Sequence, residues 1–230
     1  MLSFVMYITY RQIWLSAVAA LAALLAAPAQ GQVYVAYQNP DGLIGIQGWS
    51  GTLGMQFTVN SPILVTALGI FDSGADGLVG TLNTNLWSVN DMVTPLASMT
   101  FTAAMPGTLD AGGMDGSSRF LPLLTPLRLD PGDYVIAADS FSSDDPNANE
   151  VVQIKTWTTN DGGGLITFDA NSPYDSSPGV FPTIPYTNPN GYAAGTFQFT
   201  SAVPEPGEYA LMMGAAALGL AGWRRRRARR

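Results

Sequence analysis

The sequence predicts an all-β protein, an antiparallel β-sandwich of jelly-roll kind, flanked by an N-terminal signal helix and a short C-terminal transmembrane helix. Hydrophobic residues make up 47% of the 230 residues and charged residues only 12%. Glycine and proline are frequent, with 25 and 16 copies, as expected for many turns. Between the two ends, apolar and polar residues alternate with a period of two in short segments, which is the pattern of half-buried strands.

Ten segments carry this strand pattern. The turn sequence Asn60-Ser61-Pro62 separates two of the clearest, and Asp130-Pro131-Gly132 predicts a type II turn between two others. Residues 171–190 contain five prolines and are expected to form a long ordered loop. The predicted strands are residues 33–37, 55–59, 63–71, 82–89, 92–102, 120–129, 134–139, 151–158, 165–168 and 196–200.

Residues 56–138 contain several short motifs of one kind. The motifs are Phe57-Thr58-Val59, Thr66-Ala67-Leu68-Gly69, Phe71-Asp72, Asp76-Gly77-Leu78, Leu86-Trp87 and Leu129-Asp130-Pro131-Gly132-Asp133-Tyr134-Val135-Ile136. Together they resemble a β-sandwich module common in exported bacterial surface proteins. That module has no settled activity, so the resemblance implies a fold and no reaction.

Residues 1–29 have the pattern of a secretory signal peptide. An apolar run follows Arg11, and Ala27-Pro28-Ala29 offers small residues for cleavage by signal peptidase after Ala29. Met6 is an alternative start to Met1, and an uncleaved N-terminal anchor is the alternative reading of the whole segment. Residues 30–202 are then the mature β-sandwich domain.

The last 28 residues, 203–230, form three blocks. The motif Val203-Pro204-Glu205-Pro206 should be extended, because proline disfavours helix at the residue before it. The uncharged residues 209–223 predict a transmembrane helix of about 22 Å, short for a hydrocarbon core of about 30 Å. Tyr209 and Trp223 lie at its ends, where interfacial aromatic residues are expected. The basic cluster 224–230 follows directly, beginning with Arg224, Arg225, Arg226 and Arg227.

This order of blocks resembles the PEP-CTERM sorting signal of exosortase substrates. The resemblance implies that a membrane-embedded exosortase cleaves near the motif and that the protein then reaches the cell surface or matrix. The arginines predict a cytoplasmic C-terminus and an exported remainder of the chain. Gly207-Glu208 after the motif departs from the small hydroxyl and aromatic residues that are commoner there. A plain C-terminal anchor is the alternative.

Charge and residue types exclude several functions. Fifteen carboxylates and three cations give residues 30–202 a net charge of −12, which repels nucleic acid. The sequence has no histidine and no cysteine, so catalytic triads, zinc sites of the usual kind and disulfides are excluded. A glycosidase needs only two carboxylates, but no catalytic pair stands out among acids that mostly occupy turns. We therefore expect no enzyme activity.

Two acidic loops are candidates for calcium binding, since calcium takes six to eight oxygen ligands. Asp72 and Asp76 are spaced four apart in a glycine-rich loop, and Asp144 and Asp145 begin the oxygen-rich stretch 144–150. Neither loop matches a full EF-hand, and solvated turns are the alternative for both. No other cofactor is predicted.

Tryptophans offer flat faces for a sugar ring. Trp87 and Trp157 lie within predicted strands and are expected in the core, which leaves Trp49 as the surface candidate. The leading hypothesis is an exported, exosortase-processed surface or matrix protein with a structural or adhesive domain. The alternatives are a module that binds exopolysaccharide and, third, a secreted enzyme acting on glycans.

Overall fold

The computed structural model describes residues 31–110 and 117–202, together with single residues between 214 and 227. The chain divides into two compact units, one of which is Gln32–Val203. The described part of this unit is built from antiparallel sheets, with one turn of 3-10 helix, η1 (Ser73–Ala75), as its helical element. The prediction of an all-β antiparallel protein is confirmed.

The first sheet has five strands in the order β1-β15-β4-β8-β7. Its strands β15 and β4 are far apart in the sequence and pair along seven residues. The strands are β1 (Tyr34–Val35), β15 (Gly195–Ser201), β4 (Ile63–Phe71), β8 (Ser118–Leu129) and β7 (Thr108–Leu109).

The second sheet has six strands in the order β12-β3-β9-β5-β6, with β13 pairing β3 off this path. Two further two-stranded sheets are formed by β10 with β14 and by β2 with β11. The strands are β12 (Ile166–Phe168), β3 (Thr52–Val59), β9 (Gly132–Asp139), β5 (Thr81–Ser88), β6 (Ala97–Thr102), β13 (Tyr174–Asp175), β10 (Ala148–Asn149), β14 (Tyr192–Ala193), β2 (Tyr37–Gln38) and β11 (Thr158–Thr159).

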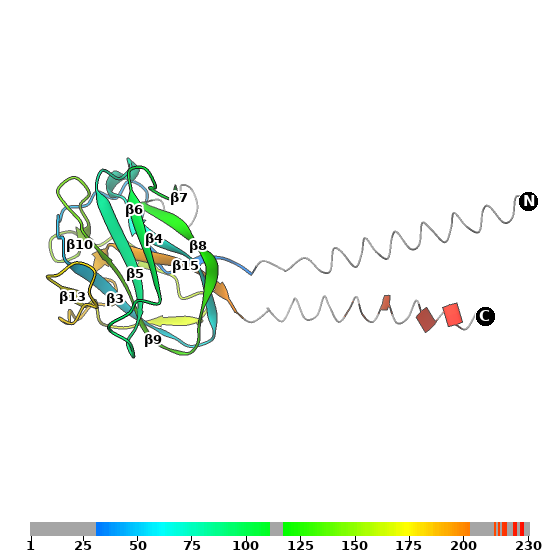
Figure 1. Ribbon diagram of the computed structural model, residues 1–230. Helices are drawn as coiled ribbons and strands as arrows, with labels where there is room; N and C mark the ends of the chain where they lie inside the picture. The colour runs from blue at the N-terminus through cyan, green and yellow to red at the C-terminus, as the bar shows by residue number, and fades with distance from the viewer. Residues whose placement is uncertain are drawn as a thin grey trace, which may run out of the picture. The chain divides into compact units, whose positions relative to one another are not determined.

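The two large sheets lie face to face, with β5 and β6 in front of β4 and β15 in Figure 1. The side chains that alternate inward from both sheets form the main core. Phe57 of β3 is fully buried, and its ring lies 4.8 Å from that of Phe197 on β15 and 5.8 Å from that of Tyr134 on β9. A second buried cluster, which includes Phe71, Phe101 and Trp157, continues this core.

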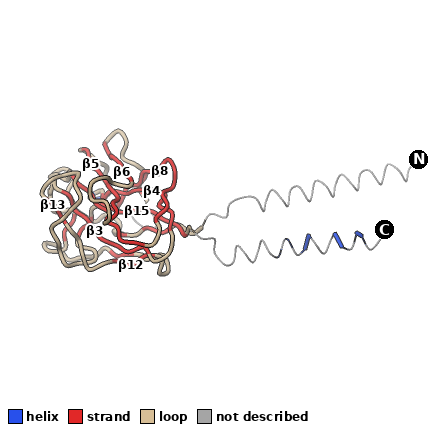
Figure 2. Tube along the Cα trace, turned by 60° about the horizontal axis from the view of Figure 1, so that its bottom comes forward, coloured by secondary structure: helices blue, strands red, loops and turns tan. Residues whose placement is uncertain are grey.

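The outer face of the second sheet is covered by the loop 171–190. β9 is buried on both faces, because Ile136 points into the main core while Val135 and Ala137 pack with Trp87 and Phe181. Phe181 comes from the loop, and its ring meets that of Trp87 edge-on at 6.0 Å. β13 lies among these loops (Figure 2), which confirms the expectation of a long ordered segment.

Several strand predictions need correction. Residues 151–158 form a turn and an extended segment with only the last residue in a strand, and residues 92–96 precede β6 as a loop. The turn at Pro131 joins β8 of the first sheet to β9 of the second, so it is a corner between sheets rather than a hairpin. Gly132 has a φ of 158°, far from the value of about 80° that a type II turn requires. The sequence does not predict the two-residue strands β7, β10, β13 and β14.

Strand β8 carries a large irregularity in its pairing with β4. Val65 pairs with Leu127 but Ala67 pairs with Pro122, so residues 123–126 bulge outward opposite the single residue Thr66. Leu124 in this bulge is fully exposed. Pro122 and Pro126 have no backbone N–H, so neither can donate a hydrogen bond to a further strand.

The predictions for the two ends fall mostly outside the described residues. These are the signal peptide 1–29 with Ala27 and Ala29, the motif Val203-Pro204-Glu205-Pro206, Tyr209 and Arg225. The described C-terminal residues include Trp223, Arg224, Arg226 and Arg227, which are helical and exposed, and the Arg227 guanidinium lies 4.7 Å from the centre of the Trp223 ring. Within the residues that the structure describes, no helix has the length and apolarity to cross a membrane.

Candidate functional site

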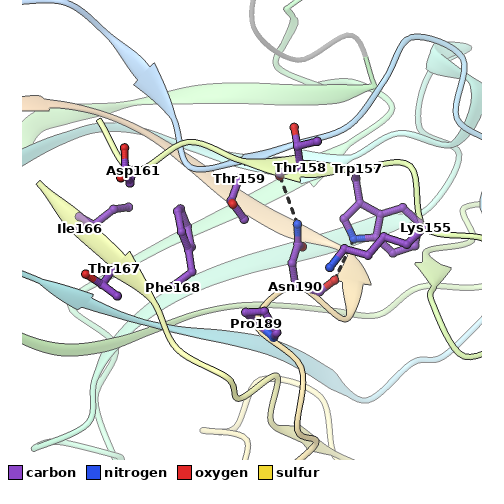
Figure 3. A pocket seen from close by; sticks show the side chains of 10 residues that line it. All are labelled: Lys155, Trp157, Thr158, Thr159, Asp161, Ile166, Thr167, Phe168, Pro189 and Asn190. Atoms are coloured by element: carbon purple, nitrogen blue, oxygen red, sulfur yellow. Dashed lines mark hydrogen bonds between the residues drawn. The ribbon is translucent and has the colours of Figure 1, made fainter. Parts of the chain in front are cut away.

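One cleft of the sandwich has a volume of about 540 Å³. It lies between β11, β12 and the end of the loop 171–190. Figure 3 shows Lys155 and Trp157 at one end of the cleft and Asp161 and Ile166 at the other. The remaining lining residues are Thr158, Thr159, Thr167, Phe168, Pro189 and Asn190. The lining thus combines hydroxyl, amide, amine and carboxylate groups with apolar side chains.

Hydrogen bonds to backbone carbonyls hold the two walls of the cleft together. The Trp157 indole Nε1 donates to the carbonyl oxygen of Asn190 at 3.0 Å, and Asn190 Nδ2 donates to the carbonyl oxygen of Thr158 at 3.1 Å. The amide oxygen Oδ1 of Asn190 is enclosed and has no hydrogen-bond partner within the described part of the chain. These bonds fix the edge of the cleft on the loop side.

An adjoining hollow of about 380 Å³ shares Thr159, Asp161 and Phe168 with the cleft and adds Gln38 and Asn160. The Phe168 ring packs edge-on against the buried Tyr37 at 5.0 Å, so its position is fixed from the core side. The two hollows therefore share one floor, and both could accept parts of an extended ligand.

A group of polar side chains lies behind Lys155. The Glu150 Oε2 is 3.8 Å from the Lys155 Nζ, and Oε1 accepts a hydrogen bond from the Tyr186 hydroxyl at 2.8 Å and another from Asn188 Nδ2. Lys155 Nζ also lies 3.4 Å from Asn188 Oδ1. Partial burial lowers the pKa of the Lys155 amine, against the opposite effect of the Glu150 charge. Burial raises the pKa of the neighbouring Tyr192 well above its ordinary value.

The first predicted calcium loop uses Asp72 internally. Its carboxylate is 1% exposed, lies 2.5 Å from the Arg119 Nε and accepts a hydrogen bond from the Gly77 amide at 3.2 Å. Burial raises the pKa of this carboxyl, and the hydrogen bond and charge of Arg119 oppose that shift only in part. Asp76, the other residue of the predicted pair, is exposed.

The second predicted calcium loop contacts the first. Asp145 is buried and accepts hydrogen bonds from the amides of Val79 at 3.0 Å and Gly80 at 2.5 Å, whereas Asp144 is exposed. The structure thus brings the two acidic loops together, although Asp72 and Asp145 are bonded to protein groups. In the described ranges, no three acidic side chains gather as metal ligands. Calcium binding by these loops stays a prediction.

Two of the three tryptophans within residues 31–202 lie inside the sandwich. Trp87 and Trp157 are each 3% exposed, as expected. Trp49 is half-buried against the second core cluster, meets Tyr174 edge-on at 6.4 Å, and has its Nε1 enclosed without a partner in the described structure. Part of its ring is therefore used in packing, and the open cleft lies elsewhere.

Sequence reasoning did not find the residues of the cleft. Lys155 carries one available signal, because it is the only lysine in the sequence. Asp161, Phe168 and Asn190 belong to no motif, and only the folding of the loop 171–190 onto β11 and β12 brings them together.

Comparison of the chain with protein-family models, with curated proteins and with solved structures finds no match.

Proposed function

We propose that the protein is an exported surface or matrix protein whose residues 30–202 form a structural or adhesive β-sandwich. The observation that supports this proposal is that three buried carboxylates bond to other groups of the protein. Asp72 binds Arg119, Asp145 binds the backbone of Val79 and Gly80, and Asp139 accepts hydrogen bonds from donors that include Asn83 and Gly179. Each ties a loop to a strand or to another loop, which suits a scaffold that must hold together without disulfides.

The strand order supports a jelly roll as the finer description. A jelly roll places eight strands in two four-stranded sheets. The main strands here fall into the sets β1-β15-β4-β8 and β3-β9-β5-β6. Taken in sequence order, these eight strands alternate between the two sets except at β5 to β6, which lie in the same set. The outermost short strands β7, β12 and β13 add to these sets without changing their order.

Export is proposed from the two terminal sequences. Signal peptidase would remove residues 1–29, and an exosortase would cleave near Val203-Pro204-Glu205-Pro206 while residues 209–223 hold the chain in the membrane with the arginines in the cytoplasm. The last strand of the described sandwich ends at Ser201, and the Ala202 amide donates to the carbonyl oxygen of Pro62 at 2.9 Å. Cleavage at the motif would therefore remove no strand from either sheet.

Cell fractionation and mass spectrometry of the full-length chain test the export proposal. The surface fraction should contain a species that lacks everything from about Tyr209 onward. Replacing Pro204-Glu205-Pro206 by three alanines should retain the full-length form in the inner membrane, whereas the matched control Glu208→Ala should be processed normally. Deleting residues 224–230 should let the chain pass through without processing. A mature species that still ends at Arg230 would show that the tail is a plain anchor.

Glycan binding is a second candidate function, favoured by the cleft. Its hydroxyl, amide, amine and carboxylate groups can each bond a sugar hydroxyl, and Phe168 gives an apolar floor. The net charge of −12 favours a neutral glycan over a polyanionic one. The cleft lining holds one carboxylate among its described residues, Asp161, where a glycosidase uses two.

Two variants distinguish the cleft from the tryptophan that the sequence suggests. Thr159→Trp should fill both hollows and abolish binding on a glycan array, whereas Trp49→Ala should leave binding intact. Loss of binding in Trp49→Ala alone would move the site to Trp49. An array with no bound glycan for the unmodified protein would reject this second function and leave the structural one.

A further inference from the structure

The group around Lys155 brings an amine, a side-chain amide and a carboxylate into contact. Lys155 Nζ lies 3.4 Å from Asn188 Oδ1, and Asn188 Nδ2 donates a hydrogen bond to Glu150 Oε1. The second oxygen of the same carboxylate, Glu150 Oε2, lies 3.8 Å from Lys155 Nζ. One carboxylate therefore faces both the amine that could attack and the amide nitrogen that would leave.

The surroundings of these three side chains favour the reactive form of the amine. The side chains of Lys155 and Glu150 are 29% and 16% exposed, and Tyr186 holds Glu150 by a hydrogen bond of 2.8 Å. Partial burial lowers the pKa of Lys155, which increases the fraction of neutral amine at neutral pH. Glu150 opposes this shift as long as it is ionised, and it would lose that effect on taking up the amine proton.

We propose that Lys155 and Asn188 become joined by an intramolecular isopeptide bond, with Glu150 as the group that transfers the proton. The neutral Lys155 Nζ attacks the side-chain carbonyl carbon Cγ of Asn188 and forms a tetrahedral intermediate. Glu150 accepts a proton from the attacking nitrogen and gives it to Nδ2. The Cγ–Nδ2 bond then breaks, ammonia leaves, and an Nζ–Cγ amide bond remains. The reaction neither oxidises nor reduces any atom, and it needs no cofactor.

Placement within the fold supports an intramolecular reaction. Glu150 lies in the turn that follows β10 and Lys155 lies in the irregular segment after that turn, whereas Asn188 lies in the loop 171–190. Hydrogen bonds already hold these segments together, because Glu150 N donates to the carbonyl oxygen of Gly191 at 3.2 Å and Trp157 Nε1 donates to that of Asn190. Fixed reactants of this kind react much faster than free ones. The proposal depends on neither the export proposal nor the ligand of the cleft.

The chain offers a clean readout, because Lys155 is its only lysine. Full-length protein should be purified in folded form, denatured and treated with an amine-specific acylating reagent. If the bond has formed, the reagent should modify no lysine. Trypsin should not cut after residue 155, and a second digestion should release one branched peptide whose mass equals the two linear peptides minus one ammonia. Tandem mass spectrometry should place the branch at Lys155 and Asn188.

Three variants and one control separate the bond from an ordinary polar cluster. Lys155→Arg and Asn188→Ala should each remove the branched peptide, and Glu150→Gln should prevent or greatly slow its formation while circular dichroism shows an unchanged fold. Asn160→Ala, which changes a nearby asparagine outside the group, should keep the branch. Full acylation of Lys155 in the folded and aged protein would overturn the proposal. A branched peptide at full yield in Glu150→Gln would overturn the role of Glu150.

Discussion

The buried pair of Asp72 and Arg119 gives the sharpest test of how the loops are held to the sandwich. Arg119 lies on β8, and its Nε is 2.5 Å from the Asp72 carboxylate just after β4. Replacing Arg119 by methionine keeps much of the apolar stem and removes the cation. The Asp72 carboxylate, 1% exposed, would then keep the Gly77 amide as a hydrogen-bond donor without a facing positive charge.

Breaking one side of a buried pair costs about 3 to 5 kcal/mol, because the remaining charge is left uncompensated. Arg119 is 16% exposed on its side chain, so water can reach part of the site and the lower value of about 3 kcal/mol is expected. Arg128 and Asp130 provide the matched control, since their side chains are 52% and 69% exposed at a distance of 2.8 Å. Arg128→Met should cost less than about 1 kcal/mol.

The loss in Arg119→Met should depend on pH in a defined direction. Burial already raises the pKa of Asp72, and removing Arg119 takes away the largest opposing effect, so the pKa rises further in the variant. A carboxyl with a raised pKa in the folded state binds its proton more tightly than in the unfolded state. Its contribution to stability is therefore fully present below the ordinary value of about 3.9 and is lost as the pH rises through the folded pKa.

Urea unfolding of the wild type and both variants, followed by tryptophan fluorescence at pH 7 and at pH 4, checks this reasoning. The difference between Arg119→Met and the wild type should be full at pH 7 and smaller at pH 4. A difference below about 1 kcal/mol at pH 7, as for an exposed pair, would show that the Asp72–Arg119 contact does not hold the loop. A difference that grows toward acid would refute the assignment of the pH effect to Asp72.

Three further predictions concern the core, the acidic loops and the inferred cross-link. Phe57→Ala should lower the free energy of unfolding by about 3 to 5 kcal/mol in urea titrations, because Phe57 is fully buried between two aromatic rings. The control Leu124→Ala, in the exposed bulge, should change the free energy of unfolding by no more than about 0.5 kcal/mol. Millimolar calcium should raise the melting temperature if the acidic loops bind it, because an ion that binds only the folded state stabilises that state, and the rise should disappear in Asp145→Asn; an unchanged melting temperature would reject the calcium hypothesis. Lys155→Arg should lower the free energy of unfolding by about 4 kcal/mol, the chain-entropy value for closing a loop of this length, and a loss typical of a surface pair would argue against the cross-link.

The sequence predicts the long strands well because each has its own local signal. β4 has the predicted bounds, since residues 63–71 follow Pro62 and alternate apolar and small or polar side chains. The segment 151–158 carries the same kind of signal and fails. Its Val151, Val152 and Ile154 are exposed, because no neighbouring strand in the described structure is placed to pair with them. Alternating apolar and polar residues show that a segment can form a half-buried strand. They do not show that another strand is available to pair with it.

The candidate sites escape prediction for a related reason. Glu150 and Lys155 are separated from Asn188 by more than thirty residues. The loop that brings Asn188 close to them has little regular secondary structure from which its course could be predicted. The acidic residues are visible as candidates in the sequence. Their bonding partners are not visible there, because Arg119 and the amides of Val79 and Gly80 reach them from other parts of the fold.

The central position of β15 has a consequence for the order of events during synthesis. β15 comprises residues Gly195–Ser201, the last strand of the described sandwich, yet it lies between β1 and β4 in the first sheet. Among the described strands, β1 has no other partner in that sheet, and one edge of β4 stays open until β15 arrives. The sheet therefore cannot be completed until residue 201 has emerged.

Pairings between such distant segments also form slowly, because the loop between them must be ordered before any contact compensates for it. A nascent chain would spend this interval with the apolar faces of β3, β4 and β9 incompletely covered, a state prone to aggregation. Holding the chain extended or protected until residue 201 has emerged would guard it against this aggregation. Pulse labelling of nascent chains that end before residue 195 should find them protease-sensitive, and chains extended beyond residue 201 should become resistant in one step.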